Sequence, residues 1–399
     1  MATTASQPPD GAEVVVLDAT NSAALSGGPH LFRRVSNDTL EIVVLGALAA
    51  LTILGGPALD VPGSAWRFRD VVLLAGLSAV VRRLYSARLE RAYDRYPELR
   101  TQPASKKRHA VVRDVTGRTA AELELIEYHD RLTMLAKFAL DVGSYALLGR
   151  VLYAPSDNTS IFLGGSAGDP SGAARLASRA AFKVVAHHYT LSFGMYWMHR
   201  LLHANAFLWR HIHSLHHYAR TPLARATYMD HWLDNIANAV IAEVGTQILC
   251  PLPKPLLFGS RLFRVCESLE KHSGLSGASI NLAHALQRSV FPFAQMPHHH
   301  DWHHEGFKGS NYTFASIGGL WDVVFGTRHP GRSAKTAQNA ATSHDDLQNR
   351  LGGKAKKNPF GAFFDRPLVC PIPTLLFAAA VGAKLFVRLG DDLPRAAAL

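Results

Sequence analysis

Residues 42–59 are almost wholly apolar, and their length of about 18 residues is what a membrane-crossing helix needs. Strand-like alternation of apolar and polar residues is nearly absent from the chain, so its apolar segments predict helices. The further apolar segments are shorter or interrupted by single charges and comprise residues 71–81, 132–153, 181–198, 236–252 and 372–388. The sequence therefore predicts an all-α, polytopic helical membrane protein with about four transmembrane helices.

The charge distribution indicates which side of the membrane one segment occupies. Of the 399 residues, 48% are hydrophobic and only 18% are charged, yet the formal net charge is +11 at pH 7. A basic segment after the second apolar run contains Arg82, Arg83, Arg88, Arg91, Arg95, Arg100, Lys106, Lys107 and Arg108. Positive residues next to a membrane helix favour the cytosolic side. No zinc-finger, homeodomain or RNA-binding signature accompanies them, so we expect a membrane, and no nucleic acid, as a partner.

The cysteine content excludes two classes of protein. The three cysteines, Cys250, Cys266 and Cys370, lie far apart in the sequence and form no CxxC motif. The pattern is therefore typical neither of a disulfide-rich scaffold nor of a thiolate zinc site.

Three compact histidine blocks are the most specific feature of the sequence. Residues 199–203 have the spacing HxxxH, and residues 213–217 and 300–304 both have the spacing HxxHH. Side chains three and four positions apart share one face of a helix, so each block directs at least two imidazoles toward a common point. We expect these histidines to be both metal ligands and catalytic residues: His199, His203, His213, His216, His217, His300, His303 and His304.

Eight imidazoles are too many for one ion, so the blocks predict a centre of two metal ions. Imidazole suits iron, zinc and copper. We include two more histidines in the predicted metal shell: His231, which follows the second block, and His272, which lies between the second and third blocks. Asp301 and Glu305 flank the third block, where a carboxylate can accept the other N–H of a ligating imidazole. The other histidines near these positions are expected to be solvated or to support the ligands: His187, His188, His211, His284, His298 and His299.

The order HxxxH, HxxHH, HxxHH amid apolar helices resembles the fatty acid hydroxylase superfamily, which includes sterol desaturases, sterol C-4 methyl oxidases and sphingolipid hydroxylases. The run Tyr-Trp-Met-His-Arg-Leu-Leu-His at residues 196–203 resembles the first block of that family. Trp209, four residues before His213, also fits the family. The third block continues, as in the family, to Asn311-Tyr312, Trp321-Asp322 and Phe325-Gly326-Thr327. The resemblance covers roughly residues 140–328.

Two positions depart from the family pattern. Thr313 stands where the family often has a glycine after the Asn-Tyr pair. After the second block, Asp230-His231-Trp232 and Asp234 stand where the family often has His-Pro with a nearby glutamate. Neither departure changes a histidine of the three blocks.

This resemblance implies an oxidoreductase, a membrane-bound non-haem di-iron oxygenase that hydroxylates or desaturates a lipid or sterol. It implies two iron ions and O2, with electrons from a separate NAD(P)H-linked cytochrome b5 or reductase. It also implies an endoplasmic reticulum membrane location if the protein is eukaryotic. Because charged and polar groups are costly in mid-bilayer, we expect the histidine blocks to form a helical cap at the cytosolic boundary. His329-Pro330-Gly331 resembles the haem-binding turn of cytochrome b5, but Arg332 and the polar surroundings argue against a fused haem domain.

The chain accordingly divides into four expected segments. Residues 1–40 are polar and predict a disordered N-terminal tail. Residues 41–135 would hold the N-terminal membrane helices and the basic cytosolic segment. Residues 136–328 would form the fatty acid hydroxylase-like di-iron domain. Residues 329–399 would comprise a polar linker and a C-terminal apolar segment.

Three alternative functions use the same residues differently. A zinc-dependent membrane hydrolase or isomerase would use the histidines as zinc ligands, but no HExxH motif supports it. A non-catalytic membrane scaffold would not need all eight block histidines, and all are present. A basic membrane-binding or nucleic-acid-binding module is the weakest alternative, because it leaves the histidine pattern unexplained.

Overall fold

The computed structural model describes residues 37–62, 64–101, 120–152, 170–218, 222–305, 310–328, 363 and 369–396. Most of the expected tail and the expected polar linker, together with His329-Pro330-Gly331, lie outside these residues. Within them, every regular element is a helix and no strand is formed. The prediction of an all-α protein is therefore confirmed.

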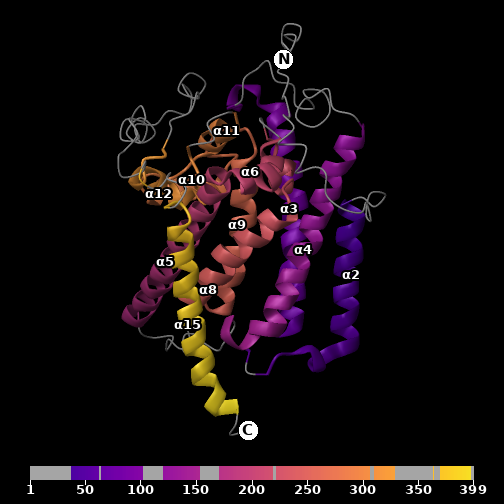
Figure 1. The fold of residues 1–399 in the computed structure, drawn as a ribbon, viewed down its shortest axis with the longest axis vertical. Coiled ribbons are helices and arrows are strands. Elements are labelled where there is room, and N and C mark those ends of the chain that lie inside the picture. Colours follow the sequence, from indigo (N-terminus) through magenta and orange to yellow (C-terminus); the bar gives the residue numbers. More distant parts are fainter. Residues whose placement is uncertain are drawn as a thin grey trace.

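Six long helices run along the longest axis of the molecule, and shorter helices gather at one end of it (Figure 1). The long helices are α2 (Asn37–Gly55), α3 (Phe68–Arg95), α4 (Ala120–Leu152), α5 (Pro170–Ala204), α9 (Lys254–Lys271) and α15 (Ile372–Ala396). The short α-helices are α6 (Ala206–His211), α7 (Trp232–Asn238), α8 (Gly245–Leu249), α10 (Leu282–Val290), α11 (Pro297–Glu305) and α12 (Gly319–Val324). The 3-10 turns are η1 (Gly56–Leu59), η2 (Pro97–Leu99), η5 (His213–Tyr218), η6 (Ala224–Tyr228) and η8 (Ser316–Gly318).

Helices α7 and α8 are joined by the π-helical segment η7 (Ala239–Val244), so the apolar run predicted at residues 236–252 is one helix with a π interruption. A π segment holds an extra residue per turn and changes which side chains face inward. Glu243, the single charge of that run, lies within this segment.

Three helices are long and apolar enough to cross a membrane. The segments are Thr39–Leu59 in α2 and the turn after it, Tyr128–Gly149 in α4, and Ile372–Leu389 in α15. Large apolar side chains on them are exposed, with Leu54 85%, Leu147 83% and Phe386 79% accessible. Such surfaces need an apolar covering, which lipid provides. The expectation of a membrane protein is met, while the number of crossings stays a prediction.

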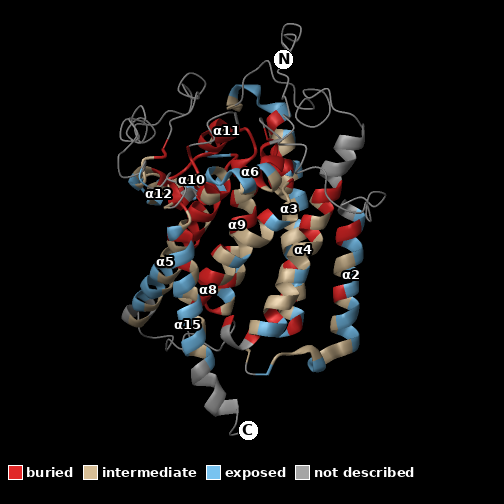
Figure 2. Ribbon diagram, viewed as in Figure 1, coloured by how far each residue is buried: buried red, intermediate tan, exposed pale blue. Residues whose placement is uncertain are grey.

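Burial differs between the two ends of the molecule (Figure 2). Buried residues gather at the end that carries α11 and the histidine blocks, where α6 and α10 are more exposed, whereas the long helices expose much of their surface below it. This compact end is the histidine-rich helical cap that the sequence predicts. Its cytosolic orientation stays a prediction.

The first part of the basic segment, up to Arg95, packs against the cap as a helix, whereas Lys106, Lys107 and Arg108 lie outside the described residues. Helix α3 continues well beyond the apolar run at residues 71–81, to Arg95. Arg88 donates hydrogen bonds to the carbonyls of Ile280 (2.8 Å) and Ser279 (3.1 Å) in the cap. Leu89 and Tyr93 of α3 bury their side chains in one apolar cluster with Leu269 of α9 and Leu275 beyond it. The positive charge therefore lies at the same end of the molecule as the histidines.

Helix α15 packs against α5 and α8 through an aromatic side chain. Phe377 of α15 lies over Gly194 of α5 and Gly245 of α8, where added Cβ atoms would approach its ring to 3.1 Å. Its side chain is buried and also contacts Phe193, with ring centroids 6.2 Å apart. Two glycines thus form the recess that receives α15.

We predict that Leu51→Arg on the exposed face of α2 lowers membrane insertion, because a charge near the middle of a lipid-facing helix costs about 3 kcal/mol. Leu51 is 51% exposed. The readout is the fraction of protein resistant to alkaline carbonate extraction, and Leu51→Phe serves as the size control. Full retention of the arginine variant would show that this face does not meet lipid.

Candidate metal centre

The first histidine block ends helix α5, the longest helix of the fold. His199 and His203 are one turn apart, so both imidazoles leave the helix on one side. The neighbouring Tyr196 and Trp197 are buried against Phe325 and fix the rotation of the helix end. The chain then reverses because the Asn205 side chain accepts the N–H groups of Phe207 and Leu208 and starts α6. The reversal returns the second block to the first.

The second and third blocks use different local structures. Residues 213–218 form a 3-10 turn, whereas the third block lies in α11, a short helix that begins at Pro297. Proline is well accepted at the first helical position, because the N–H it lacks would have no partner there. In α11, His300 and His304 share one face and His303 lies beside it.

The structure brings nine of the ten predicted histidines into two adjacent groups. Within each group, the potential ligand atoms all lie within 4.8 Å of one another. The first group contains His199, His203, His213, His217 and His303. The second group contains His216, His272, His300 and His304. Ring centroids of His217 and His304 are only 4.5 Å apart, so the two groups are neighbours.

Hydrogen bonds at Nδ1 determine which ring atoms the first group of histidines directs toward its centre. His199 Nδ1 lies 2.6 Å from the carbonyl of Tyr312, and His303 Nδ1 lies 2.6 Å from the carbonyl of Ser310. A carbonyl only accepts, so each Nδ1 carries the proton and each neutral ring keeps a lone pair on Nε2. His213 Nδ1 is held in the same way by a carboxylate, Asp234, at 2.5 Å.

These lone pairs face one another at very short range. The Nε2 atom of His199 is 3.0 Å from that of His213 and 3.2 Å from that of His303. No proton is available between atoms whose rings already donate through Nδ1, so the pairs repel unless a cation lies among them. The donor set therefore fits a metal ion.

The second group repeats this arrangement around His272. Its Nδ1 donates to the carbonyl of Ser268 at 3.0 Å, and its Nε2 lies 2.9 Å from His300 Nε2. His304 Nε2 is 3.1 Å from His300 Nε2. A second ion thus finds four imidazoles converging beside the first five.

Burial keeps these imidazoles in the form that binds metals. Removal from water lowers the pKa of His199, His203 and His217 well below the usual histidine range, and the neighbouring histidines lower it further. Because only the neutral imidazole is a ligand, the folded protein presents a binding-competent set at neutral pH.

One carboxylate that orients a grouped histidine is Asp234, which follows the second block. Asp234 is 2% exposed and is itself held by Asn238, whose amide donates to it at 2.7 Å. Asp301 accepts a hydrogen bond from the hydroxyl of Thr101, and the Glu305 side chain lies outside the described residues. The departure from the family pattern after the second block therefore supplies the orienting group.

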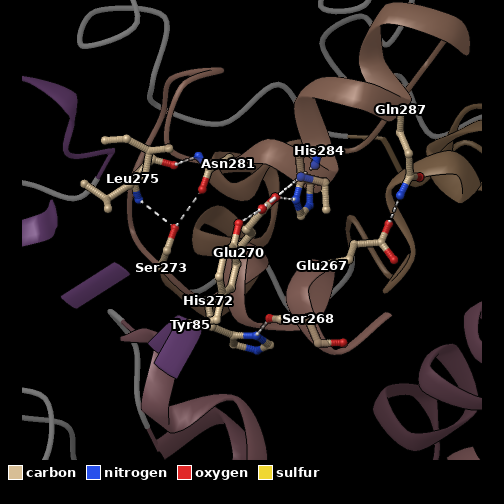
Figure 3. A network of polar contacts seen from close by, with 12 residues as sticks. Tyr85, Glu267, Ser268, Glu270, His272, Ser273, Leu275, Asn281, His284 and Gln287 are labelled. Carbon is tan, nitrogen blue, oxygen red and sulfur yellow. Dashed lines mark hydrogen bonds and ion pairs between the residues drawn. The ribbon is translucent and has the colours of Figure 1, made fainter. Parts of the chain in front are cut away.

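A buried polar network holds the segment that carries His272 (Figure 3). Glu270, in the last turn of α9, accepts hydrogen bonds from the N–H groups of Ala283 and His284, both at 2.9 Å. It also accepts from the Tyr85 hydroxyl of α3 at 2.5 Å and from His284 Nδ1 at 2.8 Å. Glu267, one turn earlier, accepts from Gln287 at 2.6 Å. These bonds tie α9 to α3 and α10 and leave His272 little freedom.

The loop after the third block supplies the two carbonyls that orient His199 and His303. Asp322 shapes this loop by accepting the N–H groups of Tyr312 (2.9 Å) and Thr313 (3.1 Å). Thr313 replaces the common family glycine, and its hydroxyl donates to the carbonyl of Gly318 at 2.9 Å. At Gly319 a Cβ would lie 2.0 Å from the carbonyl oxygen of Phe293, so only glycine fits.

His231 does not join either group. Its Nδ1 accepts the N–H of Leu233 at 3.2 Å and caps α7, and its ring centroid lies 4.8 Å from that of His129. The histidines expected to play supporting roles include His187, which lies 2.7 Å from the Cys250 carbonyl, and His188, which bonds Ser260 at 2.9 Å.

A cavity of about 200 Å3 reaches the histidines from among the long helices. It touches His213 of the first group and His216 and His272 of the second. Part of its wall is apolar and comes from α3, α4, α5 and α9 with the loop before α3: Trp66, Val71, Leu74, Phe138, Leu191 and Leu257. The cavity therefore gives an apolar segment access to both groups of histidines.

Comparison with known proteins shows what the segment that carries this site is similar to. Residues 184–327, which contain all nine grouped histidines, match the model of the family described as fatty acid hydroxylase. Over 152 residues the chain is 28% identical to a very-long-chain aldehyde decarbonylase of Oryza sativa subsp. indica, covering 38% of the chain and 55% of that protein. It is 31% identical over 156 residues to a putative methylsterol monooxygenase of Dictyostelium discoideum, covering 37% and 51%.

A third relative is a sphinganine C4-monooxygenase of Arabidopsis thaliana, 28% identical over 161 residues, covering 39% of the chain and 58% of that protein. The chain thus spans about half the length of the curated relatives it matches. No solved structure matches the chain.

We predict that Asp234→Asn weakens metal binding roughly 10- to 100-fold, because His213 loses the carboxylate that fixes its ring and raises its basicity. The measurement is metal retained by the purified protein against a graded chelator. Glu243→Gln, which alters a carboxylate that lines the same cavity without contacting a grouped histidine, should retain metal like the wild type. Equal retention by the Asp234 variant would remove this carboxylate from the site.

Proposed function

We propose that this chain, whose residues 184–327 match the family model described as fatty acid hydroxylase, is a membrane-bound non-haem di-iron oxygenase of lipids or sterols. One observation carries the proposal: two neighbouring groups of five and four histidines share a cavity that extends among the long helices. The di-iron domain would occupy residues 136–328, after the N-terminal membrane helices and basic segment of residues 41–135.

The number of ligands supports two ions. An ion with six coordination positions cannot accept nine imidazoles, whereas five and four leave positions open on each of two ions. Open positions are what a metal centre needs to bind a further reactant. When bound, two irons would supply the activation of O2, with two external electrons, that cleavage of an unactivated C–H bond requires.

The residues of the chain have three tasks in this reaction. The carbonyls of Tyr312 and Ser310 and the Asp234 carboxylate hold protons on Nδ1, so that Nε2 of His199, His303 and His213 stays directed inward. The cavity wall excludes water from the reacting carbon. Its contact with both groups holds a hydrocarbon segment beside them.

The reaction also needs a membrane setting and a protein that supplies electrons. Electrons would come from a separate NAD(P)H-linked cytochrome b5 or reductase approaching the cap from the aqueous side. The basic residues of α3, which lie at that end, would face the cytosol. In a eukaryote the protein would reside in the endoplasmic reticulum membrane. The relatives are named for different substrates, so the proposal names the substrate only as a lipid or sterol.

We predict that the wild-type protein binds two irons per chain and that His303→Ala and His300→Ala, one in each group, each retain at most one. Removing one imidazole opens one coordination sphere and leaves the other intact. Elemental analysis of protein purified in detergent measures the ratio. His211→Ala, outside both groups, should keep two irons. Zinc as the tightly bound metal would instead favour the hydrolase alternative.

We also predict that cells lacking the protein accumulate an unoxidised lipid or sterol, which the wild-type gene removes and the His303→Ala gene does not. Mass-spectrometric profiling of membrane lipids and sterols measures this difference. Full correction by His303→Ala would separate the function of the protein from its metal centre.

A further inference from the structure

One face of helix α4, which contains a candidate membrane span, carries charged side chains and lines the cavity. The residues on this face are Asp130, Thr133, Met134, Lys137, Phe138 and Asp141, spaced three and four apart. At 1.5 Å per residue, Lys137 and Asp141 lie roughly 10 and 16 Å along the axis from Asp130. Asp141 is therefore near the middle of the apolar segment Tyr128–Gly149.

The charges at that depth form a nearly neutral set. Arg261 of α9 contacts both Asp141, at 3.4 Å, and Glu243, at 3.0 Å. The Lys137 ammonium lies 5.4 Å from the centre of the Tyr228 ring, which also lines the cavity. Among the described residues, Lys137 forms no ion pair. Two positive and two negative groups thus surround one part of the cavity, and the lysine has capacity for another acceptor.

Ionised groups in a membrane-spanning region cost free energy, and those that occur there usually have a function. Apolar residues of similar size would close the same space at lower cost, since buried ion pairs seldom add stability over hydrophobic packing. Glu243 also depends on the π segment for its position, and such segments occur frequently at functional sites. Two unusual features therefore converge on one region of the cavity.

We propose that Lys137, with Asp141 and Glu243 beside it, binds a hydroxyl group of the substrate, so that the enzyme acts on a neutral lipid alcohol. This proposal rests on the proposed function. A hydroxyl accepts a hydrogen bond from the ammonium and donates one to a carboxylate, which satisfies both signs of charge. A fatty acid carboxylate would meet the same lysine but also two carboxylates, which disfavour it.

The position of this polar set also fixes what part of the substrate is oxidised. The hydroxyl would lie beside α4, while the hydrocarbon body extends toward His213 and His216. Oxidation would then occur at a set distance from the hydroxyl rather than next to it. A long-chain primary alcohol and a hydroxysterol both have this chemistry.

The test measures binding by the full-length, iron-loaded protein in detergent. The probes are radiolabelled 1-hexadecanol, its methyl ether and hexadecanoic acid, and, in a second arm, radiolabelled cholesterol and its methyl ether. The variant is Lys137→Met, which keeps the side-chain length and removes the donor. The control is Lys384→Met, which changes an exposed lysine of the candidate span in α15 that does not line the cavity.

In the wild type, at least one free alcohol should bind about tenfold more tightly than its ether, since the ether cannot donate a hydrogen bond to a carboxylate. Lys137→Met should weaken binding of that alcohol about tenfold, since the alcohol oxygen loses the charge-assisted hydrogen bond from the ammonium, and it should leave iron content unchanged. Lys384→Met should alter nothing. Whichever arm responds identifies the source, a chain alcohol or a sterol.

Equal affinity for alcohol and ether in the wild type overturns the proposal in both arms, and this result does not require the variant to fold. Unchanged affinity of Lys137→Met for both alcohols, or tighter binding of hexadecanoic acid than of either alcohol, overturns it as well. Iron content separates the two proposals: a protein that binds an alcohol through Lys137 but retains no iron when iron is supplied would refute the oxygenase function and keep the hydroxyl site.

Discussion

The arrangement of the cap depends on proton placement at the Nδ1 atoms of a few buried histidines. The carbonyls of Tyr312, Ser310 and Ser268 and the carboxylate of Asp234 each accept one Nδ1–H. Each acceptor commits the opposite ring nitrogen to a lone pair, and those lone pairs converge inside a region without water. Such an array is unfavourable alone and favourable around cations. The histidines of the cap therefore favour bound cations, which supply positive charge that the side chains themselves do not provide.

Several parts of the cap exist to hold these acceptors. Asp322 and the glycines at 318 and 319 shape the loop that presents two of the carbonyls. Glu270 ties the end of α9 to α10 and α3, which places the segment that follows it. These residues lie apart from the metal positions but still matter for them. If one of the carbonyls shifted, its hydrogen bond to Nδ1 would break and the histidine ring could rotate.

The sequence predicted the helical class and nine grouped histidines because both follow from short-range spacing. The prediction that His231 belongs to the metal shell assumes that one helix continues from the second block. The chain instead forms 3-10 turns and starts α7 anew at that residue, so the helical register could not be extended. Asp301 follows His300 by one position, about 100° around the helix, and it accepts a hydrogen bond from Thr101. The contact between Asp234 and His213 could not be predicted from the sequence, because it depends on which turn folds back onto His213.

The structure also differs from the sequence expectation in the length and regularity of helices. The apolar run at residues 71–81 marks only the first part of α3, because arginines continue the helix to the cap, where carbonyls accept their hydrogen bonds. The π interruption at residues 239–244 has no signature in the periodicity of a short apolar run. Tertiary contacts rather than local preference determine both features.

The recess in which Phe377 sits has a consequence for the order of assembly during synthesis. Its two walls, Gly194 and Gly245, belong to helices made long before α15 leaves the ribosome. The recess must remain open, or be covered by lipid or another protein, until α15 arrives. A nascent chain would thus carry a nearly complete cap above a bundle that still lacks α15, and Phe377 would enter its recess only after that cap had been made.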